Sequence, residues 1–261
     1  MHPHPTPTTL SLLLAAGLVT LPALGQSSIV NGLLAHYPFS GSAADVSGGQ
    51  HHGTVIGAKP AADRFGQANR AFAFSSTTGA IRIPLDTTAF AGDFTVSLWF
   101  NAVDYLNAWP TLLHAENDAF SLALAGDRCG CNLSGFTIAS ASRRAGTFTW
   151  RLIRMQPTPT GTFVHVVVTR SGSDVTMYWN SEIAVVGGLS DPAINPGPNL
   201  WIGRAPREDV PGSSAFHGTI DDLRIYNRAL SAHEIRALYR HESAPQPDVP
   251  RAAAARSEER R

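Results

Sequence analysis

The chain has 261 residues, of which 43% are apolar and 15% are charged, so it can form a core and is not disordered as a whole. Twenty basic side chains balance twenty acidic ones, and a net charge of zero supplies no field that would attract nucleic acid or an anionic membrane surface. The 23 glycines and 18 prolines favour many turns between short strands.

The first 25 residues have the pattern of a secretory signal peptide. Residues 10–24 form an apolar stretch that is too short to cross a bilayer comfortably as a helix. Small residues at Ala23 and Gly25 match the positions before a cleavage site, although the region before the apolar stretch has no Lys or Arg. We therefore predict a signal peptide over 1–25 and a mature protein that is secreted, periplasmic or on the cell surface. The alternative, a buried helix of the folded domain, is less favoured because Pro22 cuts it short.

The body of the chain, residues 29–242, reads as a series of strands. Apolar residues recur mostly at every second position and are bounded by Gly, Pro, Asn and Asp. The alternation is clearest over residues 94–100. Further strands are predicted at 33–39, 110–114, 120–124, 136–139, 147–155, 162–170, 174–179, 199–202 and 217–226.

Two pairs of these strands are predicted to be neighbours. Residues 165–170 and 174–179 flank a Ser-Gly-Ser turn, which predicts a β-hairpin. Residues 71–74 and 80–83 flank a turn that ends at a glycine, which predicts a second pair.

Two cysteines, Cys129 and Cys131, are the only ones in the chain. Because a structural zinc site needs four ligands, they cannot form one by themselves. We predict that they are a candidate disulfide that staples a local loop, with two reduced thiols as the open alternative. At the end of the chain, residues 243–261 contain three prolines and no apolar periodicity, which predicts a disordered C-terminal tail.

One short helix is predicted near the end of the body. Ser231 and Glu234 have the spacing of a capping box, and Ile235, Leu238 and Tyr239 fall on one helical face. Many strands without an alternating strand–helix rhythm exclude a parallel α/β fold. The sequence therefore predicts an all-β fold: a two-sheet antiparallel jelly-roll sandwich over residues 26–242, with one short C-terminal helix.

Five stretches carry a family resemblance. They are LAHYPF at 34–39, DVSGGQHHGTV at 45–55, AFAF at 71–74, FTVSLWF at 94–100 and FHGTIDDLRIYNRALS at 216–231. In this order the chain resembles the laminin-G-like, concanavalin A-like jelly-roll domain of secreted bacterial proteins, over roughly residues 33–239. The resemblance implies two facing, curved antiparallel sheets, a structural calcium ion, and binding of glycans or proteins rather than catalysis.

The positions of two aspartates predict where calcium would bind. If residues 219–225 form a regular strand, Asp221 shares the core-facing side with aliphatic residues, and a carboxylate there needs a proton, hydrogen bonds or a cation. The glycine-rich turn at Asp45 supplies a second carboxylate, and Gln50 or its neighbours supply carbonyl oxygens, which suit calcium. The resemblance adds that the two regions meet near the sandwich edge. The alternative left open is that Asp45 caps its own turn and Asp221 pairs with an arginine.

Catalysis is the less favoured class of function. A glycoside hydrolase needs two carboxylates that flank the scissile bond, and the nearest arrangement, Glu116-Asn117-Asp118, falls in a predicted turn. No Gly-x-Ser-x-Gly nucleophile elbow is present. A lyase with residues from separate strands stays open. The adjacent His51 and His52 are predicted to be polar surface rather than metal ligands. We predict that the protein is not an enzyme.

Aromatic side chains are the candidates for ligand contacts, because exposed aromatic faces stack on sugar rings. Trp109 lies in a loop-like stretch and is the best single candidate. Trp99 has the parity opposite to its apolar neighbours, so it faces outward or into a curved sheet. Four arginines between residues 143 and 154 form a basic strip, which we interpret as a solvated strand face rather than a site for acidic glycans.

Together these patterns predict a secreted, non-catalytic module that binds carbohydrate and is stabilised by calcium. The alternative is a protein-binding adhesive or structural surface component. The predicted partners are a glycan or an extracellular protein, without nucleic acid and without membrane insertion.

Overall fold

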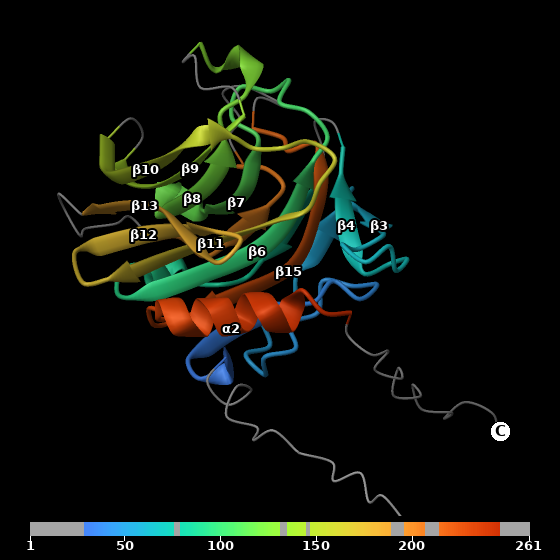
Figure 1. Cartoon of the computed structure of the whole chain (residues 1–261), viewed down its shortest axis with the longest axis horizontal. Coiled ribbons are helices and arrows are strands. Elements are labelled where there is room, and N and C mark those ends of the chain that lie inside the picture. Colours follow the sequence, from blue (N-terminus) through green and yellow to red (C-terminus); the bar gives the residue numbers. More distant parts are fainter. Residues whose placement is uncertain are drawn as a thin grey trace, which may run out of the picture.

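The computed structural model describes residues 29–75, 79–130, 135–144, 147–188, 196–206 and 214–245. Two antiparallel sheets pack face to face, and one helix covers the outer side of one sheet (Figure 1). The predicted jelly-roll sandwich with one C-terminal helix is confirmed. The predicted signal peptide and the tail beyond residue 245 lie outside the described residues.

The first sheet, sheet A, has eight strands. They are β1 (Leu33–Tyr37), β3 (Lys59–Ala61), β4 (Ala71–Phe74), β6 (Phe94–Ala102), β11 (Val164–Ser171), β12 (Asp174–Trp179), β13 (Glu182–Gly188) and β15 (Gly218–Tyr226). Their order is β13-β12-β11-β6-β15-β4-β3, and β1 also pairs with β15.

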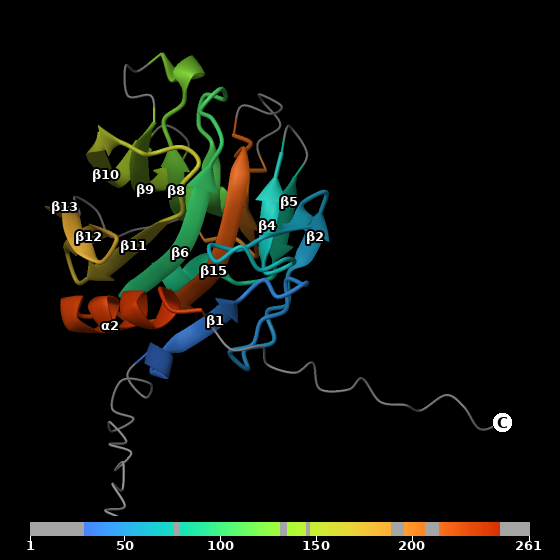
Figure 2. The same ribbon diagram turned by 45° about the vertical axis from the view of Figure 1, so that its right-hand side comes forward.

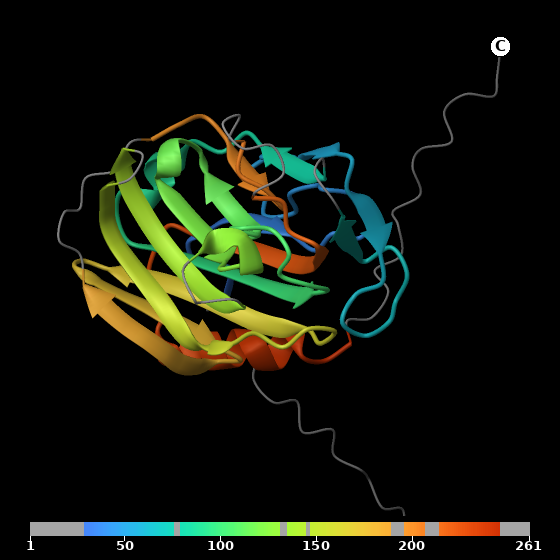
Figure 3. The same cartoon turned by 90° about the horizontal axis from the view of Figure 1, so that it is seen from above.

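The second sheet, sheet B, has seven strands. They are β2 (Thr54–Ile56), β5 (Ala80–Ile83), β7 (Thr111–Ala115), β8 (Phe120–Leu124), β9 (Phe136–Arg144), β10 (Thr147–Pro157) and β14 (Leu200–Ile202). Their order is β10-β9-β8-β7-β14-β5-β2. The short helices η1 (Thr87–Phe90), η2 (Glu116–Asp118) and η3 (Asp127–Cys129) lie in the connections. Seen from above, sheet B lies in front of sheet A (Figure 3).

The core lies between the sheets because alternate side chains of each strand point inward. The even-numbered residues from Phe94 to Phe100 in β6 are fully buried there, as the alternation predicts. Phe90, Phe94 and Phe120 pack together with ring centroids 5.1 to 5.3 Å apart. Contacts of this kind make the mainly apolar interior that positions the outer faces of both sheets.

Helix α2 (Ala232–Glu242) covers the outer face of sheet A, beside β1 and the beginning of the described chain (Figure 2). Ser231 caps it and forms the predicted capping box with Glu234. Ile235 and Leu238 pack against Val167 and other buried side chains of sheet A. The helix therefore closes a second, smaller apolar layer on that sheet. Among the described residues, no helix is both long enough and apolar enough to cross a lipid bilayer.

Of the two predicted strand pairs, one is confirmed and one is wrong. The hairpin of β11 and β12 is confirmed, with Ser171 opposite Asp174. The predicted pairing of 71–74 with 80–83 is wrong, since β4 lies in sheet A and β5 in sheet B. Both strands alternate in the same way, so the local pattern does not show that the chain changes sheets between them.

Candidate functional site

The first predicted metal ligand, Asp45, is held by backbone amides. Its Oδ1 accepts hydrogen bonds from the N–H groups of His36 at 3.0 Å and Ser47 at 2.9 Å, and its Oδ2 accepts one from the N–H of His51 at 3.1 Å. Burial alone raises the pKa of Asp45, but the hydrogen bonds from Ser47 and from the backbone lower the pKa to about 2. Asp45 is thus an ionised carboxylate that caps its own turn, which is the alternative that the sequence left open.

The rest of that turn contains Gln50 and two histidines. Gln50 is exposed and has a left-handed φ of 58°. The Nδ1 of His52 accepts a hydrogen bond from the backbone N–H of Asp45 at 3.1 Å, and the ring of His51 lies 3.4 Å from the carboxylate. His52 therefore fastens the turn through its ring, and His51 fastens it through its backbone N–H.

The second predicted ligand, Asp221, does not face the core. Asp222 has a φ of +48°, and the pairing of β15 with β6 shifts register between Asp221 and Arg224. This β-bulge inserts one residue, so Asp221 and Arg224 both point to the outer face under α2, while Ile220 and Leu223 point into the core. The expectation of a core-facing Asp221 was wrong because the strand is not regular at this position.

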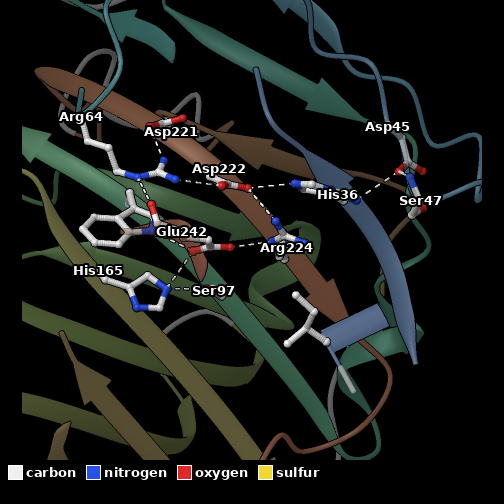
Figure 4. Close-up of polar contacts among 12 residues, drawn as sticks. His36, Asp45, Ser47, Arg64, Ser97, His165, Asp221, Asp222, Arg224 and Glu242 are labelled. Carbon is white, nitrogen blue, oxygen red and sulfur yellow. Dashed lines mark hydrogen bonds and ion pairs between the residues drawn. The ribbon is translucent and has the colours of Figure 1, made fainter. Parts of the chain in front are cut away.

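On the outer face of sheet A, the bulge creates a buried cluster of charges (Figure 4). Asp221 Oδ2 accepts a hydrogen bond from Arg64 Nη1 at 2.5 Å, and Asp222 Oδ2 accepts one from Arg64 Nη2 at 3.2 Å. Asp222 Oδ1 lies 2.8 Å from His36 Nε2 and 3.5 Å from Arg224 Nη2. Asp221 is therefore paired with an arginine, again as in the open alternative.

The last residue of α2, Glu242, belongs to the same cluster. Its Oε1 accepts a hydrogen bond from Arg224 Nε at 2.6 Å, and its Oε2 accepts one from Trp99 Nε1 at 2.8 Å. His165 Nε2 lies 3.5 Å from Oε2 and 2.7 Å from the hydroxyl of Ser97. The indole of Trp99 stacks on the ring of His165, so Trp99 faces outward and is buried by the helix.

Burial governs the ionisation of this cluster. It raises the pKa of Asp221 to about 7, with repulsion by Asp222 adding to the effect and the guanidinium of Arg64 opposing it. Burial also raises the pKa of Glu242, and it lowers the pKa of His165 to about 3. His165 is consequently neutral, and its Nδ1 has no hydrogen-bond partner within the part of the chain that the structure describes.

The residues predicted to hold calcium do not fit a shared calcium site. The contacts that lead from Asp45 to Asp221 run through His36, Asp222 and Arg64, so the two carboxylates do not face one point (Figure 4). Among the described residues, no three side chains of His, Cys, Asp or Glu group together so that they could hold a metal ion. The calcium ion itself stays a prediction, and its two predicted carboxylate donors, Asp45 and Asp221, are used by other groups.

The outer face of sheet B carries a different arrangement, a row of side chains that are opposite one another on successive strands. The cross-strand row consists of Thr54, Arg82, Trp201, His114, Ser121, Ser140 and Arg151. Their neighbours along each of the central strands, such as Ile81, Ile83, Leu200 and Ile202, are in the core. Seven strands about 4.8 Å apart give the row a length of roughly 29 Å.

Trp201 lies near the middle of the cross-strand row and is half-buried. Its Nε1 donates a hydrogen bond to Glu116 Oε1 at 3.1 Å, and the same carboxylate accepts hydrogen bonds from Asn199 Nδ2. These contacts fix the edge of the indole. On one side of Trp201 lies the exposed Arg82, and on the other lies the buried His114, whose Nε2 is 3.9 Å from Asp118 Oδ1.

The turn that holds these acids is η2, which confirms the turn predicted at Glu116-Asn117-Asp118. Asn117 and Asp118 both have left-handed backbones, with φ of 60° and 61°. Asn117 Nδ2 donates to the carbonyl of Pro196 at 2.9 Å, which anchors the turn. Non-glycine residues in this conformation are often found where a side chain must be held for function.

Sequence reasoning missed Arg82, His114 and Trp201 as a group. Each one is a single polar or aromatic residue between two aliphatic ones, and this pattern predicts an outward-facing side chain. Their proximity depends on the order β5-β14-β7, in which strands far apart in sequence are neighbours. A single sequence does not reveal that order.

The predicted contact residue Trp109 lies off this row, in the loop between β6 and β7. It is 40% exposed, and Val103 and Leu106 of the same loop are each 57% exposed. The loop is well anchored, since the N–H of Asp127 donates to the carbonyl of Tyr105 and the N–H of Gly126 donates to the carbonyl of Ala108.

The described residues test two further predictions, the disulfide and the basic strip, only in part. Cys131 lies outside the described residues, so its disulfide with Cys129 stays a prediction. In the predicted basic strip, the side chains of Arg143 and Arg144 are not described, Arg151 lies in the cross-strand row, and the guanidinium of Arg154 packs 3.9 Å from the ring centroid of Trp179. Arg151 and Arg154 therefore do not share one face of β10.

Several solved structures have a similar fold. The binding domain of Paraclostridial Mosquitocidal Protein 1 has 16% identity and a TM-score of 0.64, over 82% of this chain and 53% of that chain. Botulinum neurotoxin type C, whose cell entry depends on interaction with two ganglioside molecules, has 14% identity and a TM-score of 0.63, over 83% and 52%. The binding domain of botulinum neurotoxin DC, in complex with rat synaptotagmin II, has 13% identity and a TM-score of 0.62, over 82% and 52%.

This chain spans about half the length of those chains, and identities this low show the fold alone. The search of curated proteins finds no match. A family model described as the concanavalin A-like lectin/glucanases superfamily matches residues 75–236, which is more than half of the chain. The chain belongs to the concanavalin A-like lectin/glucanase superfamily.

Proposed function

We propose that this protein is a non-catalytic binding module that binds an extended carbohydrate along the cross-strand row of sheet B. The supporting observation is Trp201, which is half-buried near the middle of the row, has its indole edge fixed by Glu116, and lies between Arg82 and His114. An aromatic ring can stack on a sugar, and the flanking donors and acceptors can bind its hydroxyl groups. The similar toxin domains are binding domains too, and one of them belongs to a toxin that interacts with gangliosides.

The geometry favours a chain of sugars over a single one. The row is roughly 29 Å long and carries exposed or half-buried side chains on five of its seven strands. Beyond His114 on the same face, Ser121 provides a half-buried hydroxyl group, whereas Ser140 is buried. If the predicted signal peptide is cleaved, the module acts outside the cytoplasm.

A glycan array tests the proposal, followed by titration of the best oligosaccharide with the purified protein. Trp201→Ala should weaken binding at least about tenfold, as is usual for a central aromatic contact, and Arg82→Ala should weaken it less. Trp109→Ala is the matched control, because it removes an exposed tryptophan that lies off the row. Binding that survives Trp201→Ala and is lost in Trp109→Ala would contradict the proposed site.

A second candidate function, binding to an extracellular protein, is favoured by the loop between β6 and β7. Val103, Leu106 and Trp109 expose apolar surface on a backbone that is already ordered by hydrogen bonds, so a partner would not have to order the loop. A photo-crosslinking residue at Leu106 would capture such a protein. The same group at Val186, an exposed apolar residue of β13, is the matched control.

A further inference from the structure

Arg64 joins three parts of the chain that are far apart in sequence. Its side chain is almost fully buried, and each of its guanidinium nitrogens donates a hydrogen bond. Nη1 donates to Asp221 Oδ2 at 2.5 Å, Nη2 donates to Asp222 Oδ2 at 3.2 Å, and Nε donates to the backbone carbonyl of Glu242 at 2.8 Å. The planar group also lies over the ring of Trp99, 4.9 Å from its centroid.

These partners are the kind of oxygen atoms that a calcium ion selects, namely carboxylates and a backbone carbonyl. A guanidinium presents its donors in a rigid, planar fork and keeps its charge when buried. Arg64 therefore brings a positive charge to the junction of β15 and α2, which is where the predicted ligand Asp221 lies (Figure 4). The other predicted ligand, Asp45, already accepts three backbone hydrogen bonds.

We propose that Arg64 is a built-in cation that takes the place of a calcium ion at the junction of β15 and α2, so that the folded domain needs no divalent cation there. The proposal is independent of carbohydrate binding. It departs from the structural calcium ion that the family resemblance implies. It also means that Arg64 attaches the end of α2 to β15.

The charges around Arg64 explain why its loss would matter. The cluster holds three carboxyl groups, those of Asp221, Asp222 and Glu242, and two guanidinium groups, those of Arg64 and Arg224. Without Arg64, three buried carboxyl groups would face one guanidinium and the imidazole of His36, which contacts Asp222 alone. His165 cannot supply the missing charge, because it is fully buried and packed against Trp99 and Tyr239.

Thermal unfolding of the full chain tests the proposal. For the wild type, we expect the same Tm in excess EDTA and in millimolar calcium. Arg64→Gln should lower the Tm by roughly 6–20 °C, because it leaves buried carboxylates without their cation. Unlike the wild type, this variant should regain part of its Tm when calcium is added, because the ion can then enter between the carboxylates.

Two further variants keep the test decisive. Arg64→Lys retains the charge without the fork, so it should fold with an intermediate Tm that does not respond to calcium, even if Arg64→Gln fails to fold. Arg82→Gln removes an exposed arginine from sheet B and should leave the Tm unchanged. A wild-type Tm that falls in EDTA and recovers with calcium would overturn the proposal, and so would an Arg64→Gln variant as stable as the wild type.

Discussion

The outer faces of the two sheets treat polar side chains in opposite ways. Under α2, the charged groups on the outer face of sheet A are buried and pair with one another, as Arg64 does with Asp222 and Arg224 with Glu242. On sheet B, the cross-strand row leaves Arg82 exposed and Trp201 half-buried. The comparison teaches that charge by itself does not indicate a binding site. A polar group that is fully used inside the fold contributes to structure, whereas one that is held in place but left open can meet a ligand.

The largest expected effect is on stability, from a substitution in the buried cluster. Glu242→Ala removes the acceptor of both Arg224 Nε and Trp99 Nε1, and it takes the nearer of two carboxylate partners from the buried guanidinium of Arg224. We expect a loss of about 3–5 kcal/mol in the free energy of unfolding, measured by denaturant titration. Glu182→Ala, on the exposed edge strand β13, is the control and should change it by less than about 0.5 kcal/mol. Equal effects of the two substitutions would break the distinction between the faces.

The second prediction concerns pH. The pKa of Asp221 is about 7 in the folded protein and 3.8 as its ordinary value, so between these values the native state binds more protons than the unfolded state. Stability due to this group therefore falls as the pH rises from about 4 to 7, by an amount on the order of 1–3 kcal/mol. His165, with its pKa lowered to about 3, acts in the other direction between pH 3 and 6.5.

Asp221→Asn separates the two groups, because it removes the decline due to Asp221 and keeps the rise due to His165. Denaturant titrations of both proteins at several pH values give the difference curve. A difference that stays constant between pH 4 and 7 would show that Asp221 does not titrate in this range.

The third prediction contrasts two tryptophans, one on the outer face of each sheet. Trp99→Phe removes the hydrogen bond to Glu242 Oε2 and should cost about 1–3 kcal/mol of stability without weakening ligand binding. Trp201→Ala should do the reverse, with weaker carbohydrate binding and a smaller loss of stability. Stability and carbohydrate binding are measured for both variants. Loss of binding in Trp99→Phe, with binding retained in Trp201→Ala, would reverse the assignment of the two faces.

The smallest effect is expected at the start of α2. Ser231→Ala removes the side chain that accepts the hydrogen bond from the N–H of Glu234, and it should destabilise the protein by about 1 kcal/mol. Ser231→Asp restores a capping oxygen and should recover most of this loss. Thermal unfolding distinguishes them, and identical Tm values for Ser231→Ala and the wild type would mean that tertiary contacts alone hold the helix start.

The bulge at Asp222 explains why the direction of the Asp221 side chain was not predicted correctly from the sequence. Strand parity placed Asp221 toward the core, and one inserted residue moved it to the opposite face, beside Arg64. The two successive acids between Ile220 and Leu223 break the alternation and are a visible signal of such an irregularity. The open alternative, an arginine partner, was correct for Asp221, but the sequence did not identify that arginine.

The sequence by itself determined the fold class, most strands, the β11–β12 hairpin and the capped helix, because alternation, turn residues and capping are local properties. Only the tertiary structure decided which strands are neighbours, and with them the cross-strand row around Trp201 and the meeting of Arg64 with Asp221 and Glu242. The reason is physical. Pairing between distant strands depends on the shape of the whole core, and many strands with the same alternating pattern could pair equally well.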